Sequence, residues 1–135
     1  MEGKMEFVSA IHPSINIGNE VTIGKGTVIM AGVIINNNTQ IGEHCFIATN
    51  FSIDHDSSMG DFASVSAGVT SGGSVSIGAF TAVCLGASII HMRNVGKHSV
   101  VGAGSLVVKN VPHNVVVYGS PAKTVRERKN DDRYL

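Results

Sequence analysis

The chain has 135 residues, of which 43% are hydrophobic and 15% charged, and 10 basic residues balance 10 acidic ones. This length predicts a single domain, and the lack of net charge argues against nucleic acid as the main partner. No apolar stretch approaches the length that crosses a membrane and no signal peptide is visible, so we expect a cytoplasmic protein without a membrane partner.

In chain order, residues 1–10 form a lead-in without a strong pattern, which we expect to cover one end of the structure that follows. A repeat then occupies residues 11–112. Every sixth residue from Ile11 to Val107 is apolar, with Ser71 as the exception. A period of six fits neither a helix face nor an isolated alternating strand, and it is typical of the short strands and turns of a parallel β-helix.

A second period, of eighteen residues, lies on the first. Pairs of an apolar residue and glycine recur at Ile23–Gly24, Ile41–Gly42, Met59–Gly60, Ile77–Gly78 and Val95–Gly96. Three hexapeptides therefore make one coil, and residues eighteen apart stack in one column about 4.8 Å apart. We predict an all-β fold, a parallel β-helix of about six triangular coils in which each coil buries its inward residues against the next.

One polar cluster in the repeat has the composition of a catalytic site. Asp54, His55 and Asp56 are consecutive, and a carboxylate beside an imidazole raises its basicity and fixes its tautomer. This is what a general base requires, although a solvated turn would also favour aspartate. One coil further in the same column is Gly73, whose backbone N–H is a candidate oxyanion donor; a tight corner is the alternative interpretation.

Cysteine and histidine spacing argues against a disulfide and against a metal site. The separation of Cys45 and Cys84 is not a multiple of eighteen, so they do not share a column. His91 lies two coils from His55, about 9.6 Å by the strand spacing, which is too far for the two to share a metal ion. We expect no bound metal.

Gly68, Gly86 and Gly104 form another column, accompanied by Ala67, Leu85 and Ala103. A stripe without bulky polar side chains makes a smooth groove for a long thin ligand, or simply meets the steric needs of turns. A groove on one convex prism has a single wall, so a second subunit is needed to enclose an extended ligand.

The last segment, residues 113–135, is predicted as a final strand at 115–118 and a short helical tail that caps the array. Pro112 cannot continue a strand ladder, which places the end of the repeat there. Half of the basic residues gather at the end of the chain, and they suit a phosphate-bearing ligand or a solvated helix. They are Lys123, Arg126, Arg128, Lys129 and Arg133.

The hexapeptide pattern resembles the left-handed β-helix acyltransferases. The stretches SIDHDSSMGDF, SAGVTSGGSVSIG, VGAGSLVVKNVP and YGSPAK are similar to the β-helix domain of the sialic acid and bacillosamine-type sugar acetyltransferases. The resemblance covers roughly residues 11–123, and it implies a homotrimer that binds acetyl-CoA between neighbouring prisms and acetylates a hydroxyl or amine of a small acceptor, such as a sugar or a nucleotide sugar.

The same resemblance implies roles for individual residues. His55 is the general base, Asp56 orients it, and the N–H of Gly73 meets the thioester carbonyl. Asp54 and Ser64 lie on the acceptor side, although the family usually has a second histidine where this chain has Ser64. The residues expected along the acyl donor are Gly73, Leu85, Gly86, Ala103, Gly104 and Lys123.

Two other functions are compatible with the repeat. One is a non-catalytic β-helix that serves as a scaffold or binding module. Two features favour it: Ser64 replaces the second histidine of the family, and the sequence starts close to the β-helix, without the family's nucleotide-sugar-binding domain. The other is a zinc hydratase of the γ-carbonic-anhydrase kind, which needs a close histidine pair. His91 and His98 are seven residues apart, a poor match for that pair.

Overall fold

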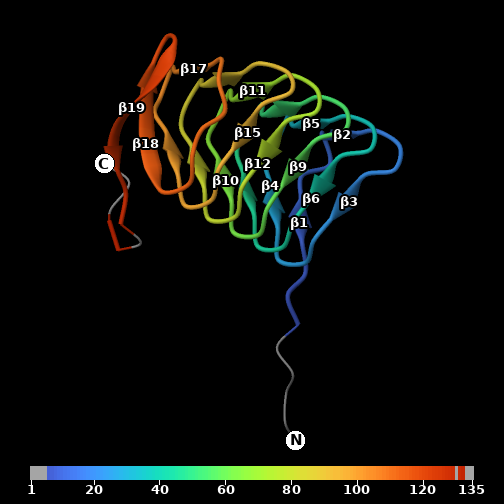
Figure 1. Cartoon of the computed structure of the whole chain (residues 1–135). Helices are drawn as coiled ribbons and strands as arrows, with labels where there is room; N and C mark the ends of the chain where they lie inside the picture. The colour runs from blue at the N-terminus through green and yellow to red at the C-terminus, as the bar shows by residue number, and fades with distance from the viewer. Residues whose placement is uncertain (1–5, 130, 133–135) are drawn as a thin grey trace, which may run out of the picture.

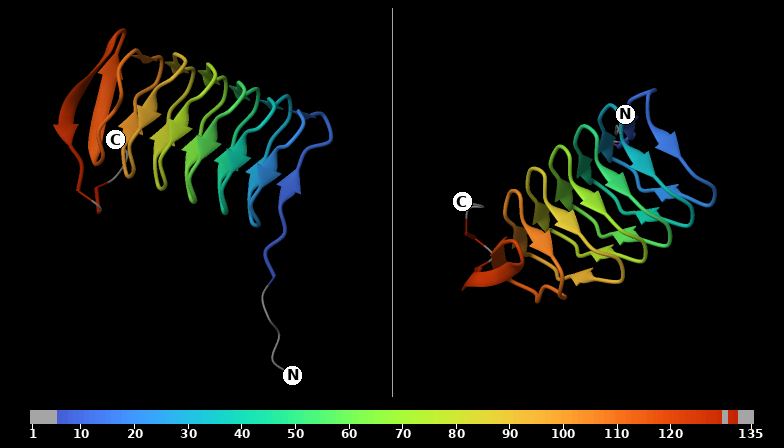
Figure 2. Two further views of the ribbon diagram at one scale, coloured as in Figure 1. Left: turned by 45° about the vertical axis from the view of Figure 1, so that its right-hand side comes forward. Right: turned by 90° about the horizontal axis from the view of Figure 1, so that it is seen from above.

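The computed structural model describes residues 6–129 and 131–132 and is an all-β parallel solenoid (Figure 1). Two-residue strands follow one another at six-residue intervals and wind the chain into stacked coils with three sides. Figure 2 shows the coils in register along the whole array, with the N-terminal and C-terminal segments at opposite ends. The predicted fold class, a parallel β-helix of about six coils, is confirmed.

Each side of the prism is one sheet, and we name the sheets A, B and C. Sheet A contains, in spatial order, β1 (Ala10–Ile11), β4 (Val28–Ile29), β7 (Phe46–Ile47), β10 (Ser64–Val65), β13 (Ala82–Val83), β16 (Val100–Val101), β18 (Val115–Gly119) and β19 (Ala122–Glu127). Sheet B contains β2 (Asn16–Ile17), β5 (Ile34–Ile35), β8 (Ser52–Ile53), β11 (Thr70–Ser71), β14 (Ser88–Ile89) and β17 (Leu106–Val107). Sheet C contains β3 (Thr22–Ile23), β6 (Gln40–Ile41), β9 (Ser58–Met59), β12 (Ser76–Ile77) and β15 (Asn94–Val95).

The period of eighteen is the register of these sheets. Val65 of β10, for example, pairs in parallel with Val83 of β13 on one side and with Ile47 of β7 on the other. A residue's column is therefore fixed by its place in the eighteen-residue coil. Corners of the prism lie between sheets A and B, B and C, and C and A.

The apolar sixth residues fill the interior. From Ile29 to Val107 they are at most 5% exposed, including Ser71, whose hydroxyl donates to the Gly72 carbonyl at 3.3 Å. Ile11 and Ile17 are 43% exposed because they belong to the first coil, where the described chain places no coil beneath them. The described part of the lead-in runs beside the prism, with the Phe7 ring edge-on to His44 at 4.8 Å.

The expected C-terminal helix is wrong. Residues Ala122–Glu127 form β19, which pairs antiparallel with β18 and closes a hairpin on sheet A. The free edge of β18 offers unpaired backbone groups, and the β-branched Thr124 and Val125 suit a strand, so edge pairing wins over helix formation. Because β18 itself pairs with β16, the last strand continues the sheet of the repeat.

Replacing Phe51 by alanine should destabilise the solenoid strongly. Phe51 is fully buried at the inner side of the A–B corner, and its removal opens a cavity that neighbouring coils cannot fill. We expect a loss of about 3–5 kcal/mol in the free energy of unfolding, measured by urea denaturation. Phe62→Ala is the control, because Phe62 is 51% exposed; equal losses in both variants would contradict this description of the core.

Candidate active site

Asp54, His55 and Asp56 form the turn between β8 and β9, at the B–C corner of the prism. Asp56 adopts a left-handed backbone conformation with φ of 56°, as do the equivalent residues of most other corners. The turn projects the imidazole and the Asp56 carboxylate outward, where their side chains are 57% and 55% exposed. The repeat thus places an imidazole and a carboxylate at a corner of the prism, where a ligand can reach both.

The carboxylate of Asp56 fixes the imidazole of His55. The Nδ1 of His55 lies 2.8 Å from Oδ2 of Asp56, and since a carboxylate only accepts, Nδ1 carries the proton. Nε2 is then the basic nitrogen. This hydrogen bond, and secondarily the charge of Asp54, raises the pKa of His55 above the ordinary value for histidine. The ring therefore has both the tautomer and the basicity of a proton acceptor.

Asp54 supports the turn and forms no hydrogen bond with the imidazole. Its Oδ1 accepts from the backbone N–H of His55 at 2.8 Å and from Nδ2 of Asn36 at 2.9 Å. These two bonds lower the pKa of Asp54, so the carboxylate stays charged. Asn36 was missed by sequence reasoning, although it lies one coil before Asp54 in the same column and the eighteen-residue period identifies the pair.

Gly73 lies directly beside Nε2. A Cβ atom added to Gly73 would come within 2.7 Å of both Cε1 and Nε2 of His55, so only glycine leaves the ring in its place. The two residues meet because they are eighteen apart in one column, as predicted.

The backbone N–H of Gly73 has no hydrogen-bond acceptor within the described part of the chain. At equivalent corner positions the N–H donates to a side chain one coil further on, as Asn19 does to Asn37 and Glu43 to Asp61. The residue one coil beyond Gly73 is His91, and no such bond forms. The N–H of Gly73 is therefore available to a ligand.

A pocket of about 430 Å³ joins these groups. It is lined by Asp54, His55, Gly72, Gly73, Ser74, His91 and Met92. His55 brings a basic nitrogen to this pocket and Gly73 brings a free backbone donor. An acyl transfer site needs this combination: a proton acceptor for the nucleophile and a donor for the developing oxyanion.

The structure places the other predicted ligand-binding residues elsewhere on the prism. Leu85, Gly86, Ala103 and Gly104 lie at the A–B corner, so the whole width of sheet B separates them from His55. Gly86 and Gly104 have φ of 63° and 67°, and a Cβ at either would meet nothing within 4 Å. These glycines therefore serve a left-handed turn on an open edge.

Ser64 and Lys123 are also distant from His55 within one chain. Ser64 lies on β10 in sheet A, and Lys123 lies on β19, opposite Tyr118. Cys45 and Cys84 are both free, and burial raises the pKa of both thiols, which disfavours the thiolate form of a nucleophile.

Among residues 6–129 and 131–132, no three His, Cys, Asp or Glu side chains lie close enough together to hold a metal ion. The described residues also include no helix that is long and apolar enough to cross a membrane.

Comparisons with known proteins agree with this architecture. Residues 14–49 match the family model described as bacterial transferase hexapeptide (six repeats). A variant of perosamine N-acetyltransferase from Caulobacter crescentus, in complex with CoA and GDP-perosamine, superimposes with a TM-score of 0.88 at 34% identity. The match covers 90% of this chain and 58% of that one. Since a superposition cannot match coils of opposite hand, the two solenoids wind in the same direction.

Two further relatives carry related activities. The acetyltransferase domain of PglB from Neisseria gonorrhoeae FA1090, in complex with acetyl coenzyme A, has a TM-score of 0.87 and 28% identity, over 89% of this chain and 58% of that one. The galactoside O-acetyltransferase of Lactococcus lactis is 50% identical over 38 residues, which are 28% of this chain and 18% of the relative.

The chain spans well under two thirds of each of these three relatives. The repeat, the three-sided coil and these matches show that the chain is a hexapeptide-repeat β-helix similar to that of acyltransferases. Within that class, this chain is similar to the β-helix domain of bacterial sugar acetyltransferases.

Proposed function

We propose that the protein is an acetyltransferase that moves the acetyl group of acetyl-CoA directly to an amine or hydroxyl of a sugar, with His55 as general base. The observation that carries the proposal is the juxtaposition at the B–C corner. The free Nε2 of His55, whose partner nitrogen is bonded to Asp56, faces Gly73, whose N–H is unoccupied.

The reaction follows from these two groups. The acceptor amine or hydroxyl attacks the thioester carbonyl carbon while its proton passes to Nε2 of His55. The carbonyl oxygen becomes an oxyanion and receives a hydrogen bond from the N–H of Gly73. When the carbon–sulfur bond breaks, the thiolate of CoA takes up the proton from the imidazolium, which restores the base. No covalent enzyme intermediate is needed, so the thiols of Cys45 and Cys84 have no role.

A second copy of the chain completes the site in this proposal. The smooth A–B corner with Leu85 and Gly86 and the catalytic B–C corner are separated on one prism, so a single chain supplies one wall. If the B–C corner of one copy faces sheet A and the A–B corner of the next, Ser64, Leu85 and Ala103 come to line the same groove as His55. In a closed ring of three copies, the B–C corner of each copy faces the A–B corner of the next, so all three grooves are equivalent.

Relatives support the choice of acceptor. The perosamine N-acetyltransferase was solved with GDP-perosamine, an amino sugar linked to a nucleotide, and the Lactococcus relative acts on galactosides. We propose an amino or hydroxy sugar, free or nucleotide-linked. The test is release of free CoA thiol from acetyl-CoA over a panel of such acceptors. Release that depends on an acceptor supports the proposal, whereas CoA binding without turnover on any acceptor favours a binding module.

The pH dependence should identify the base. Because His55 must be neutral to accept a proton and its pKa is raised by Asp56, kcat/KM should rise with pH through a midpoint above about 6.5. Asp56→Asn removes the carboxylate, so the midpoint should move to lower pH and the plateau should fall. The measurement is kcat/KM from pH 5 to 9 for both proteins. An unchanged midpoint in Asp56→Asn would contradict the assignment.

A further inference from the structure

The backbone N–H of His55 is bonded differently from its counterpart two coils earlier. Residues 19, 37, 55 and 73 share one column at the B–C corner. The N–H of Asn19 donates to Oδ1 of Asn37, one coil further on, at 2.8 Å. The residue one coil beyond His55 is Gly73, which has no side chain to accept the corresponding bond. Because only a glycine leaves room for the imidazole there, the main chain of His55 needs another acceptor.

Asp54 supplies this acceptor, and Asn36 holds Asp54 in place. Oδ1 of Asp54 accepts from the N–H of His55 at 2.8 Å and from Nδ2 of Asn36 at 2.9 Å. Asn36 is itself fixed to the strand ladder, since its N–H donates to the carbonyl of Ile53 at 3.0 Å. A donor from the preceding coil therefore determines where the Asp54 oxygen lies, and that oxygen determines the direction of the His55 N–H.

The carbonyl of His55 is held from the opposite direction. It accepts from the N–H of Ser74, in the following coil, at 2.8 Å. Backbone bonds of this kind recur between neighbouring coils, whereas the bond on the N–H side depends on the Asn36 and Asp54 side chains. The two carboxylates thus have different tasks. Asp56 fixes the imidazole ring, and Asp54 fixes the main chain that carries it.

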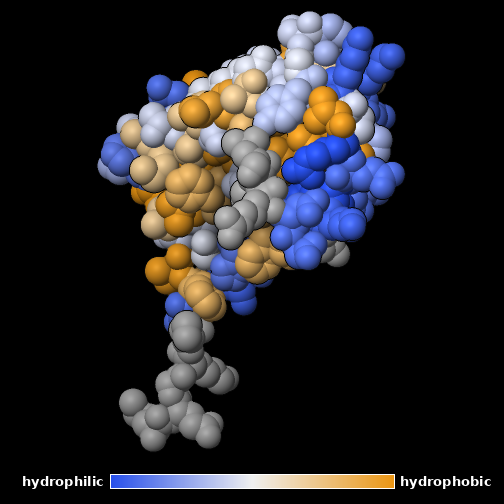
Figure 3. All heavy atoms as spheres, turned by 90° about the vertical axis from the view of Figure 1, so that its left-hand side faces the viewer, coloured by the Kyte–Doolittle hydropathy of each residue, from blue (hydrophilic) through white to orange (hydrophobic). Residues whose placement is uncertain are grey.

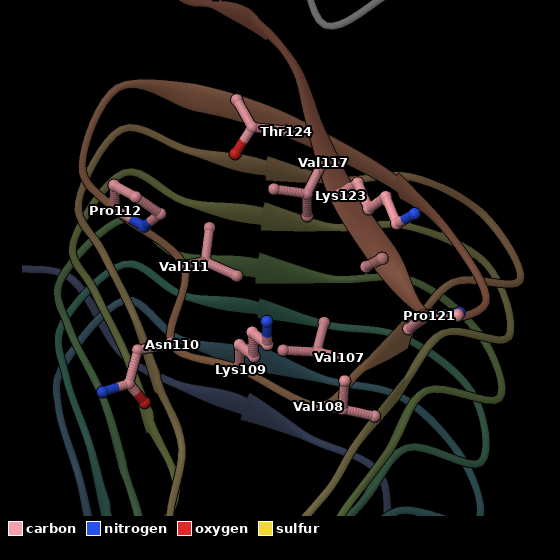
Figure 4. Close-up of a pocket in the computed structure, with 11 residues that line it drawn as sticks. Val107, Val108, Lys109, Asn110, Val111, Pro112, Val117, Pro121, Lys123 and Thr124 are labelled. Carbon is pink, nitrogen blue, oxygen red and sulfur yellow. The ribbon is translucent and has the colours of Figure 1, made fainter.

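An asparagine is an ordinary residue on the surface of this prism. Hydrophilic residues lie beside apolar ones on the surface seen from the C-terminal end (Figure 3). Asn110 lines the pocket at that end, beside the β18–β19 hairpin (Figure 4). The side-chain oxygens of Asn110 and Asn37 each accept from a backbone N–H of the preceding coil. Asn36 differs because its amide is the donor, and its acceptor is the carboxylate bonded to the main chain of His55.

We propose that Asn36 is a positioning residue for the general base: through the Asp54 carboxylate it fixes the turn that presents Nε2 of His55 to the pocket beside Gly73. This inference rests on the proposed function, because that function makes His55 the base. Asn36 is not among the residues that line this pocket, so it acts on the rate through the turn and not by contact with a substrate. Loss of its side chain should lower kcat and leave KM for acetyl-CoA unchanged.

The kinetic test compares Asn36→Ala with Asn37→Ala. Asn37→Ala is the matched control, because it removes the same amide from the neighbouring position, where the amide bonds to Asn19. The kcat of Asn36→Ala should fall about tenfold, the value of one hydrogen bond to a charged group, and that of Asn37→Ala should stay close to the wild-type value. Asn36→Asp keeps the shape of the side chain but replaces the donor by a carboxylate that repels Asp54, so its kcat should fall at least as far.

Two measurements report on the turn itself and need no acceptor. In Asn36→Ala the amide hydrogen of His55 should exchange with solvent about tenfold faster, because the oxygen that holds it is no longer fixed. The pKa of the Asp54 carboxyl, followed by carbon NMR, should rise, because one of the two donors that stabilise its charged form is lost. Asn37→Ala should change neither quantity.

The outcomes separate this inference from the proposed function. Wild-type turnover in both Asn36→Ala and Asn36→Asp, or wild-type exchange of the His55 amide in both, would overturn the role of Asn36. An equal loss of kcat in Asn36→Ala and Asn37→Ala would overturn it as well, since the effect would then be a general loosening of the corner. Wild-type protein that acetylates no acceptor would overturn the proposed function, and the exchange and carboxyl measurements would still decide whether Asn36 holds the turn.

Discussion

His55→Ala should lower kcat by about 10²–10⁴, the usual effect of removing a positioned proton acceptor. The fold should be unaffected, because the side chain is 57% exposed at a corner and none of the buried apolar residues depends on it. CoA should still bind, since the base acts on the proton of the acceptor. The measurement is steady-state kinetics at saturating acetyl-CoA, with circular dichroism and CoA titration as controls for folding and binding.

His91→Ala is the discriminating companion to that variant. His91 lines the same pocket but forms no hydrogen bond with a carboxylate in the described chain. We expect His91→Ala to retain most of the turnover. Full turnover in His55→Ala, combined with loss of turnover in His91→Ala, would show that His91 is the general base instead of His55.

Gly73→Ala should lower turnover by about a hundredfold while leaving stability nearly unchanged. The new methyl group would stand 2.7 Å from Cε1 and Nε2 of His55, and the imidazole, as the free end of a side chain, would swing away. A displacement of about 1 Å at a reacting group can cost a hundredfold in rate. The ring would also lose its 2.8 Å contact with Asp56, so its pKa should fall. Kinetics and the NMR titration of the imidazole measure both effects.

Gly72→Ala is the control for a simple steric effect. A Cβ at Gly72 would lie 2.7 Å from the backbone nitrogen and 2.9 Å from Cα of His91, atoms that cannot move without shifting the next coil. The free energy of unfolding of this variant should fall by about 1–3 kcal/mol, as is usual for overpacked sites, so it should unfold at a lower denaturant concentration. If Gly73→Ala loses stability like Gly72→Ala and keeps its turnover, the close approach of Gly73 to His55 has no catalytic meaning.

The periodicity made the coil and the column that contains His55 predictable. A spacing of six assigns the inward residues, and a spacing of eighteen assigns neighbours, so the contact between His55 and Gly73 follows from counting alone. The same count identifies Asn36 beneath Asp54. Asparagine is an ordinary residue on a solvated corner, and only its hydrogen bond to the carboxylate of Asp54 shows that it supports the turn.

The tail was less predictable because its conformation depends on a tertiary contact. The sequence from Thr124 onward is rich in helix-forming charged residues, but this segment pairs with the open edge of β18 and forms the strand β19. Similarly, the stripe of Gly68, Gly86 and Gly104 is visible in the sequence, yet its separation from His55 by the width of sheet B appears only when three sheets are laid around the axis. Sequence spacing gives columns within one chain, whereas the groove that we propose between two corners depends on how copies of the chain assemble.

The most direct test of the central claim is transfer of an isotopically labelled acetyl group from acetyl-CoA to an amino or hydroxy sugar, followed by mass spectrometry of the acceptor. Wild-type protein should yield labelled acetyl-sugar and free CoA in equal amounts, and His55→Ala should yield about 10²–10⁴ times less in the same interval. Labelled product from His55→Ala at the wild-type rate, or no labelled product from wild-type protein that binds CoA across the whole acceptor panel, would contradict the account.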